Sequence, residues 1–238
     1  MGAVVSLRAG GLDALLDARQ VWRGQPPAAA SSRQPTGFAA LDAQLPGGGW
    51  PEAALSEVLL AHDGIGELQL LWPTLARLSR EQAAPAGRVI ALIAPPYLPL
   101  ASAWMQAGVR LPALQIVQAP LREVPWAAEQ CLRSAACAAV LCWLPQADDR
   151  ALRRLQLAAD TGQCLAFAMR PLAAANQPSP AALRIAVEGR PAQLRVLKCR
   201  GGNPPVQPMA WPAAVADGDD QRAAALANPP GWAHPERA

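Results

Sequence analysis

The alternation of short apolar runs with amphipathic stretches is the feature that most constrains the fold of this chain. Residues 88–94 (RVIALIA) and 138–144 (AAVLCWL) are the clearest runs, and neither shows the polar alternation of a half-exposed strand. Strands that are apolar on both faces, separated by about 10–15 residues of helix, indicate a parallel sheet that helices cover on both sides. The sequence therefore predicts an α/β fold with a doubly wound, mostly parallel sheet.

The expected strands and helices alternate along the body of the chain. The strands are expected at Leu55–Ala61, Arg88–Ala94, Leu114–Gln118, Ala138–Leu144 and Cys164–Met169. The helices are expected at Glu67–Glu81, Leu98–Gly108, Trp126–Ala136 and Asp149–Gly162. Near the end of the body, Leu183–Val187 and Gln193–Cys199 flank Glu188-Gly189-Arg190-Pro191, a sequence typical of an antiparallel hairpin.

Changes in composition divide the chain into regions. Residues 1–24 are predicted to form an N-terminal amphipathic helix, because apolar residues recur near one face at helical spacing. Residues 25–35 are a Pro/Ala/Ser linker, residues 36–202 the α/β body, and residues 203–238 an extended, Pro-rich tail. From Gly201 onward the prolines are expected to break any regular element, apart from one short Ala-rich helix near residues 220–227.

Cysteine, histidine and charge exclude several classes of protein. The five cysteines form no C-x-x-C pair and the two histidines are His62 and His234, so neither a disulfide scaffold nor a Cys/His zinc site is expected. The net charge of +3 is too small to indicate a strong polyanion binder. No apolar run approaches the roughly 18 residues of a membrane span, and the start does not read as a signal peptide. We therefore expect a cytoplasmic protein with no membrane contact.

A degenerate phosphate-binding loop lies between the first predicted strand and helix. Residues 60–68 (LAHDGIGEL) occupy the place of a P-loop, which needs the pattern G-x-x-x-x-G-K-[ST]. When Gly66 is aligned with the second glycine, Glu67 and Leu68 stand at the positions of the lysine and the Ser/Thr. A carboxylate in place of the ammonium turns attraction to a polyphosphate into repulsion, worth about 4 kcal/mol per contact at ~4 Å and an effective dielectric constant of ~20.

The strand that would carry a metal-binding aspartate also lacks the residue that ATP hydrolysis would need. It ends at Cys142-Trp143-Leu144, so Trp143 stands where a Walker B aspartate would be. We therefore expect a protein that is not an enzyme, with no ATP hydrolysis, no cofactor and no bound metal. Two interpretations of Gly64 and Gly66 stay open. They form only a tight turn, or their loop still binds a nucleotide without hydrolysing it, because backbone amides at a helix N-terminus attract anions.

Charged residues near the predicted strand and helix ends have two interpretations each. Arg170, in Met169-Arg170-Pro171, lies at the carboxyl edge of the sheet, where α/β folds place their working surface. It has a functional role there, or it makes a capping salt bridge. Asp148-Asp149, followed by the arginines of residues 150–154, is typical of a helix N-terminus, and the alternative is a partner-binding face.

Several separated motifs resemble a known family. Residues 36–51, which include Thr36-Gly37-Phe38 and Leu45-Pro46-Gly47-Gly48-Gly49-Trp50-Pro51, resemble the segment that precedes the P-loop in RecA-type recombinases. Later motifs resemble the ImuA/SulA group, RecA-derived proteins of the bacterial SOS response, and the likeness runs from about Leu7 to Gly202. These motifs are Gly64–Leu71, Ala94–Pro99, Trp126–Gln130, Trp143-Leu144-Pro145 and Met169-Arg170-Pro171. The resemblance implies a RecA-like fold for the body.

The resemblance also implies one of two functions, both exerted through protein contact. ImuA-type proteins are accessory factors of mutagenic translesion DNA synthesis, which act with ImuB and an error-prone polymerase subunit. SulA-type proteins block cell division by binding FtsZ. The leading helix, residues 36–51 and the long C-terminal extension favour ImuA, because SulA-type proteins consist essentially of the body. The expected partners are therefore ImuB, RecA and the error-prone polymerase subunit, with self-association as a further option.

Direct DNA contact is expected to be weak or indirect. In a recombinase the DNA-binding loops would lie after Leu144 and after Pro171, and the second of these (residues 172–182) contains no Lys or Arg. Lys198-Cys199-Arg200-Gly201-Gly202 resembles the basic K-x-R-x-G element by which recombinase relatives reach a neighbouring subunit's nucleotide. Lys198 and Arg200 make a residual DNA or subunit contact, or they are a basic strand end that turns into a loop.

Apolar residues outside the body are candidate partner-binding residues. They are Leu12, Leu15, Leu16 and Trp22 in the leading helix, and Trp211 and Trp232 in the tail. A short amphipathic helix cannot bury its apolar face alone, so we expect it to dock on RecA, on ImuB or on another copy of the chain. The alternative is that it folds back on its own body. The two isolated tryptophans are interaction anchors in the tail, or they reflect background drift.

Overall fold

The chain folds as alternating strands and helices, which a computed structural model describes over residues 32–81, 87–189 and 192–211. The strands are β1 (Leu55–Leu60), β2 (Val89–Ile93), β3 (Leu114–Val117), β4 (Cys137–Trp143), β5 (Leu165–Pro171), β6 (Leu183–Gly189), β7 (Ala192–Cys199) and β8 (Met209–Ala210). The α-helices are α2 (Ala39–Asp42), α3 (Glu67–Glu81), α4 (Ala101–Gln106), α5 (Val124–Arg133) and α6 (Asp149–Gly162). Short 3-10 helices are η1 (Leu111–Ala113), η2 (Leu121–Glu123) and η3 (Leu172–Asn176).

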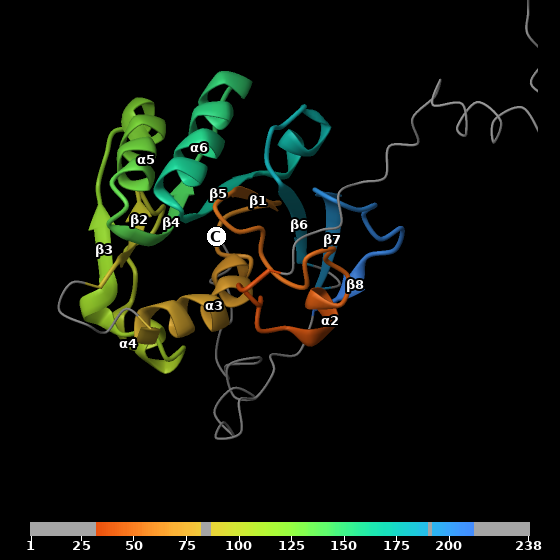
Figure 1. Cartoon of the computed structure of the whole chain (residues 1–238), viewed down its shortest axis with the longest axis horizontal. Helices are drawn as coiled ribbons and strands as arrows, with labels where there is room; N and C mark the ends of the chain where they lie inside the picture. The colour runs from red at the N-terminus through yellow and green to blue at the C-terminus, as the bar shows by residue number, and fades with distance from the viewer. Residues whose placement is uncertain (1–31, 82–86, 190–191, 212–238) are drawn as a thin grey trace, which may run out of the picture.

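The described strands form one sheet in the order β3-β2-β4-β5-β1-β6-β7-β8 (Figure 1). Every neighbouring pair from β3 to β6 is parallel, whereas β7 pairs antiparallel with both β6 and β8. This confirms the predicted α/β fold with a mostly parallel sheet and a C-terminal antiparallel hairpin. The doubly wound order brings the carboxyl ends of β1, β2, β4 and β5 to one edge of the sheet.

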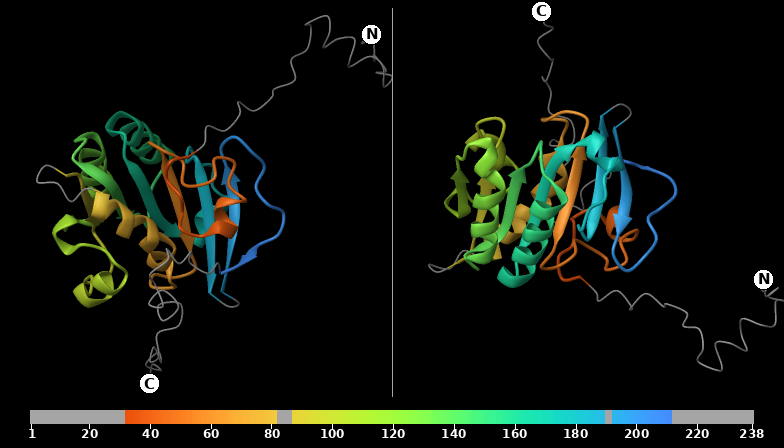
Figure 2. Two further views of the ribbon diagram at one scale, coloured as in Figure 1. Left: turned by 60° about the horizontal axis from the view of Figure 1, so that its bottom comes forward. Right: turned by 90° about the horizontal axis from the view of Figure 1, so that it is seen from above.

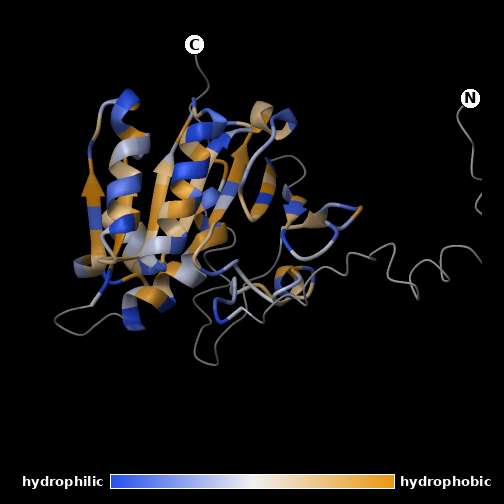
Figure 3. Ribbon diagram, turned by 45° about the horizontal axis from the view of Figure 1, so that its top comes forward, coloured by the Kyte–Doolittle hydropathy of each residue, from blue (hydrophilic) through white to orange (hydrophobic). Residues whose placement is uncertain are grey.

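Helices cover both faces of the sheet. In Figures 1 and 2, α3 and α4 lie on one face, and α5 and α6 lie side by side on the other. The hydropathy of the residues explains this arrangement. In Figure 3 the strands are largely apolar, and the helices turn their polar residues outward. The close approach of α5 and α6 requires Gly162, because a Cβ at that position would lie 1.7 Å from the carbonyl oxygen of Leu132.

The segment before β1 is part of the core. Phe38, Leu41, Leu45 and Trp50 are all buried against the face that α3 covers. The Trp50 ring meets Phe167 edge to face, with ring centroids 5.0 Å apart and planes at 83°. Its indole N–H donates to the Thr74 hydroxyl at 2.9 Å, so the largest ring of this core also has its polar group satisfied.

The structure differs from the sequence predictions at several boundaries. Helix α4 begins after the prolines at 96 and 99 rather than at Leu98, and α5 begins earlier, at Val124, because Pro125 fits the first turn of a helix. The expectation that no regular element follows Gly201, apart from a late helix, is wrong. Strand β8 pairs with β7 there, with Met209 opposite Leu194. The leading helix, residues 25–31 of the linker and the Ala-rich helix near 220–227 lie outside the described residues.

A buried ion cluster joins the middle strands. Glu57 of β1 is fully buried, Arg170 of β5 is 3% exposed and Arg184 of β6 is 6% exposed. One Glu57 carboxylate oxygen accepts from Arg170 Nη1 at 2.9 Å, and the other accepts from Arg184 Nε at 2.6 Å. The Ser179 hydroxyl also donates to this carboxylate, at 2.9 Å. The cluster therefore ties three adjacent strands to one another and to the segment after η3.

The remaining donors of the cluster hold the chain around η3 against the sheet. Arg184 donates to the carbonyl oxygens of Ala174, Ala175 and Gln177 at 2.7, 3.2 and 3.1 Å. A slip of one residue in β1 would carry Glu57 to the opposite face and leave both guanidinium groups unpaired. The strand register and the path of residues 174–179 therefore depend on the same carboxylate.

Replacing Glu57 by Gln should destabilise the protein strongly, because it leaves two buried guanidinium groups without an anion. We expect a loss of about 3–5 kcal/mol in the free energy of unfolding, measured by urea denaturation. Glu81→Gln is the matched control, because Glu81 forms an exposed pair with Arg77 on α3. That change should cost at most about 1 kcal/mol. Equal losses in the two variants would contradict the central role of Glu57.

Candidate functional site

The loop between β1 and α3 forms the candidate site, at the edge where the parallel strands end. A cavity of about 300 Å³ opens there, and its lining includes Leu60, His62, Ala94, Trp143 and Arg170. In open α/β sheets, ligands bind at this edge, beyond the carboxyl ends of the strands. The predicted P-loop remnant is therefore in the place that the sequence analysis assigned to it.

The Glu67 carboxylate occupies the anion-binding position of this loop. The carboxylate accepts the backbone N–H of Gly64 at 3.3 Å on one oxygen and that of Gly66 at 3.2 Å on the other. Both glycines have left-handed backbone angles, with φ of +79° and +113°, which turn their amides toward the same point. Glu67 is itself buried. The amides that would cradle a phosphate in a P-loop are thus hydrogen-bonded to the chain's own carboxylate.

Trp143 closes the site where a metal-binding aspartate would otherwise stand. It is the last residue of β4 and is 6% exposed. Among the described residues its indole N–H has no hydrogen-bond partner. The end of the neighbouring strand is also unusual, since Ala94 after β2 has a left-handed φ of +48°. Neither residue supplies an oxygen side chain to the site.

Trp211 lies next to the degenerate loop rather than alone in a tail. A Cβ on Gly66 would lie 3.8 Å from the Trp211 ring, and Trp211 is half-buried against the core that α3 covers. The premise that this ring has no local core is therefore wrong, because β8 draws residues 209–211 onto the sheet. Its role as a partner anchor remains a prediction. Trp232, Leu12, Leu15, Leu16 and Trp22 lie outside the described residues.

Arg170 belongs to the buried ion cluster described above. Besides its bond to Glu57, it donates from Nη2 to the Ala147 carbonyl at 3.0 Å and to the Gln177 side-chain oxygen at 3.1 Å. The guanidinium therefore connects the segment after β4 with the segment after β5. The salt-bridge interpretation describes this geometry, and a role in partner contact remains a prediction.

Lys198 and Arg200 lie at the end of β7, beside the same cluster. The Lys198 ammonium donates to the Ser179 carbonyl oxygen at 2.7 Å, and Lys198 is the cross-strand neighbour of Arg184. Burial, together with the positive charges of Arg184 and Arg200, lowers the pKa of Lys198 below its usual value. Arg200 is exposed. Lys198 is thus half-buried and bonded beside the Glu57 cluster, whereas Arg200 is exposed.

The acid–base pattern at residues 148–154 begins α6 as predicted. The Asp148 carboxylate accepts the Ala151 N–H at 2.7 Å and so caps the helix. Asp149 pairs with Arg153 at 2.8 Å along the helix, and Arg154 pairs with Glu129 of α5 at 3.4 Å. The helix-start interpretation is confirmed, and the Arg154–Glu129 pair also links α5 to α6.

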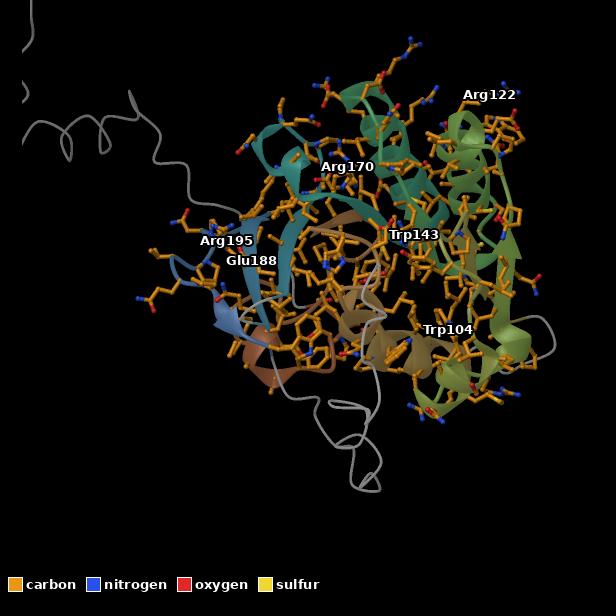
Figure 4. All side chains as sticks on the ribbon, turned by 180° about the vertical axis from the view of Figure 1, so that it is seen from behind. Trp104, Arg122, Trp143, Arg170, Glu188 and Arg195 are labelled. Carbon is orange, nitrogen blue, oxygen red and sulfur yellow. The ribbon has the colours of Figure 1, made fainter. Side chains whose placement is uncertain are left out.

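The sequence analysis missed an exposed apolar segment after β2. Tyr97, Leu98, Leu100 and Met105 are all exposed, although they surround the buried Trp104. Hydropathy could not separate them from the core, because their exposure depends on how α4 and the segment before it pack against the rest of the fold. Figure 4 shows Trp104 on the inner side of this region.

Neither a metal site nor a membrane span is found in the part of the chain that the structure describes. Within residues 32–81, 87–189 and 192–211, no group of three His, Cys, Asp or Glu side chains could hold a metal ion. None of the helices in these ranges is long and apolar enough to cross a membrane.

Comparison with known proteins finds similar solved structures but no matching family model. No family model matches the chain, and no curated protein matches it. Among solved structures, SulA from Pseudomonas aeruginosa is similar at 28% sequence identity, covering 51% of this chain and 99% of that chain, with a TM-score of 0.41. A likeness with a TM-score below 0.5 does not establish a shared fold or function.

Cys131 of α5 has a lowered pKa, which the sequence did not indicate. A hydrogen bond from the Cys137 thiol stabilises its thiolate and lowers the pKa of Cys131 to about 7, although partial burial acts in the opposite direction. The same hydrogen bond and burial raise the pKa of Cys137. Burial raises the pKa of Cys142 and Cys164 to about 12. Cys131 is therefore the most nucleophilic of these thiols at neutral pH.

Removing the Glu67 carboxylate should open the loop to anions. In Glu67→Ala the Gly64 and Gly66 amides lose their internal acceptor, and a negative charge leaves the site. We expect inorganic pyrophosphate to bind at least about tenfold more tightly than to the wild-type protein, as measured by titration calorimetry. Glu81→Ala removes an exposed carboxylate from the other end of α3 and should leave the affinity unchanged. Unchanged affinity in Glu67→Ala would show that the carboxylate does not exclude anions.

Cys131 should react with iodoacetamide in its thiolate form, with a midpoint near pH 7. The rate rises with pH because the thiolate is the nucleophile, and an ordinary cysteine would have its midpoint near pH 8.5. Mass spectrometry of the alkylated protein measures the site and the rate. Cys131→Ser should remove the fast reaction. A midpoint at or above ~8.5 for Cys131 would refute the hydrogen bond as the controlling interaction.

Proposed function

We propose that this protein is a non-catalytic accessory factor of SOS-induced mutagenic translesion DNA synthesis. In this proposal it acts in the cytoplasm, through contacts with ImuB, RecA and the error-prone polymerase subunit. The expectation that it is not an enzyme rests on the Glu67 carboxylate, which accepts hydrogen bonds from the Gly64 and Gly66 amides. A nucleotide phosphate would have to displace this carboxylate, and it would meet Leu68 in place of a hydroxyl.

Action through protein contact is supported by the exposed apolar segment after β2. Tyr97, Leu98 and Leu100 are two-thirds exposed or more, and they follow one another within four residues. Large apolar side chains gathered on a surface are typical of protein–protein contact sites. They lie beside the candidate site, because Ala94 and Pro96 of the same segment line its cavity.

The preference for an ImuA-type role comes from residues outside the shared body motifs. Residues 36–51, which resemble the segment before a recombinase P-loop, contribute Phe38, Leu41 and Trp50 to the core. Strand β8 and Trp211 extend the body beyond residue 202. A protein of the SulA type consists essentially of the body, so these additions favour the accessory role in translesion synthesis.

The alternative is a SulA-like inhibitor of cell division that binds FtsZ. The motifs Trp143-Leu144-Pro145 and Met169-Arg170-Pro171 are compatible with it, because the two kinds of protein share them. The structure explains their retention by packing as well, because Trp143 and Met169 are buried and Arg170 pairs with Glu57. The two roles are therefore separated by a cellular test.

Deleting the gene should reduce damage-induced mutation, and overproducing the protein should not make cells filamentous. The wild-type gene and a Val206→Asp control, which alters an exposed site elsewhere, should restore mutation in the deletion strain. A Tyr97→Asp, Leu98→Asp variant should fold and yet fail to restore it, because charge disrupts an apolar contact. The measurement is the mutation frequency after ultraviolet irradiation.

Two results would contradict this proposal. Filamentation with direct inhibition of FtsZ assembly would favour the division inhibitor, and normal mutation in the deletion strain would remove the accessory role. Hydrolysis of Mg-ATP above background by the purified wild-type protein would overturn the non-catalytic part.

A further inference from the structure

A second, larger cavity lies on the other side of Arg170, between the starts of α5 and α6 and the segment around η3. Its volume is about 730 Å³. We refer to it as the Trp126 groove. Its lining includes Arg122, Trp126, Pro145, Arg154, Arg170 and Gln177. Figure 4 shows Arg122 and Arg170 toward the same edge of the molecule, with Trp143 below them.

The charge of the groove is predominantly positive. Three arginines line it, and its one lining carboxylate, Asp148, is engaged in capping α6. Arg122 is largely exposed, and its pair with the adjacent Glu123 is 3.3 Å long. Arg154 is half-exposed and pairs with Glu129 at 3.4 Å. The Arg122–Glu123 pair is exposed and holds its partner weakly. Glu129 is mostly buried and pairs with Arg133 at 3.2 Å as well as with Arg154, so Arg154 can turn toward an incoming anion while Glu129 keeps a cationic partner.

Arg170 gives the groove a fixed cationic wall. Arg170 is only 3% exposed, and its hydrogen bonds to Glu57, Ala147 and Gln177 fix its position. Within the described residues, its Nε–H has no hydrogen-bond partner. A buried donor without an acceptor is uncommon in a folded protein and favours a missing partner group at this wall.

The apolar part of the groove is concentrated at one side chain. Trp126 is 61% exposed at the start of α5, with Pro125 beside it in the lining. Tryptophan and arginine are the residue types that most often dominate the binding energy of protein interfaces. An exposed tryptophan next to guanidinium groups suits a ligand that offers both an apolar side chain and carboxylates.

We propose that the Trp126 groove binds an acidic segment of a partner protein, with an apolar or aromatic side chain packed on Trp126 and carboxylates paired with Arg122 and Arg154. The inference deepens the proposed accessory function, on which it rests, by assigning a site and a chemistry to one protein contact. Charge complementarity and the volume of the cavity, which suits a few side chains, are the observations behind the choice of partner.

Single-stranded nucleic acid fits the groove less well. Such ligands need a basic track along the backbone and several aromatic rings for successive bases. Trp126 is the aromatic residue in the lining, and residues 172–182, which bound the groove, contain no Lys or Arg.

The test is selection from a displayed library of random 12-residue peptides on the immobilised full-length protein. Enriched sequences should carry two or more Asp or Glu around a Trp, Phe or Leu. Synthetic copies of these peptides should bind the wild-type chain. Their affinity should fall at least about tenfold in Trp126→Ala and in the double variant Arg122→Gln, Arg154→Gln, measured by fluorescence anisotropy.

Matched controls on α6 separate the groove from general charge and apolar effects. Arg150→Gln removes an exposed arginine and Leu157→Ala an exposed apolar side chain, and neither residue lines the groove. Both controls should bind the peptides as the wild type does. Circular dichroism should show an unchanged fold in every variant, because all the altered side chains are exposed and Glu129 keeps its pair with Arg133 when Arg154 is replaced.

Three outcomes would overturn the inference. They are a selection without acidic enrichment, peptide binding that survives both groove variants, and binding of a 20-nucleotide single strand that the groove variants abolish while peptides do not bind. The proposed function fails separately. If peptides bind in the groove but the deletion strain mutates normally after damage, the groove site stands and the accessory role is refuted. If the deletion strain loses damage-induced mutation but peptides do not bind in the groove, only the groove site is refuted.

Discussion

A carboxylate held between two buried guanidinium groups is the interaction on which the centre of this molecule depends. Glu57 connects β1 with β5 through Arg170 and with β6 through Arg184. Ion pairs in a protein interior add little net stability compared with apolar packing, but their removal is costly and their geometry is specific. Here the ion pairs fix the positions of other segments. Arg170 and Arg184 donate to carbonyl oxygens around Ala147 and in η3, and so hold these parts of the Trp126 groove in place relative to the sheet.

The carboxyl edge of the sheet combines an occupied anion nest with open contact surfaces. The Glu67 carboxylate takes the place of an external phosphate by bonding to the amides of Gly64 and Gly66. The backbone geometry that suits an anion is therefore kept, while the ligand comes from the chain itself. On either side of this nest lie the exposed segment around Leu98 and the groove beside Trp126. This edge thus combines an exposed apolar segment and a groove lined by arginines with a nest that the chain's own carboxylate fills.

Much of this architecture could be predicted from local patterns. The apolar runs at 88–94 and 138–144 became β2 and β4, and the hairpin around Glu188 formed as expected. Errors arose where partners distant in sequence decide the outcome. Strand β8 has only two residues and no periodicity of its own, so its existence depends on the free edge of β7. Trp211 was expected to be isolated because it stands in a Pro-rich tail, yet β8 carries it onto the core near Gly66.

The sequence by itself determined the order of strands and helices, the parallel sheet, and the identity of Glu67, Leu68 and Trp143 at the positions where a P-loop site would need lysine, a hydroxyl and aspartate. These follow from the spacing of apolar residues and from residue identity, both of which are local properties. Only the tertiary structure decided that Glu67 bonds to its own loop, that Arg170 pairs with Glu57 more than a hundred residues away, and that Trp126 stays exposed beside arginines. The direction, burial and ion pairing of a side chain depend on which segments come into contact in the folded chain. The spacing of residues along the sequence carries no information about these tertiary contacts.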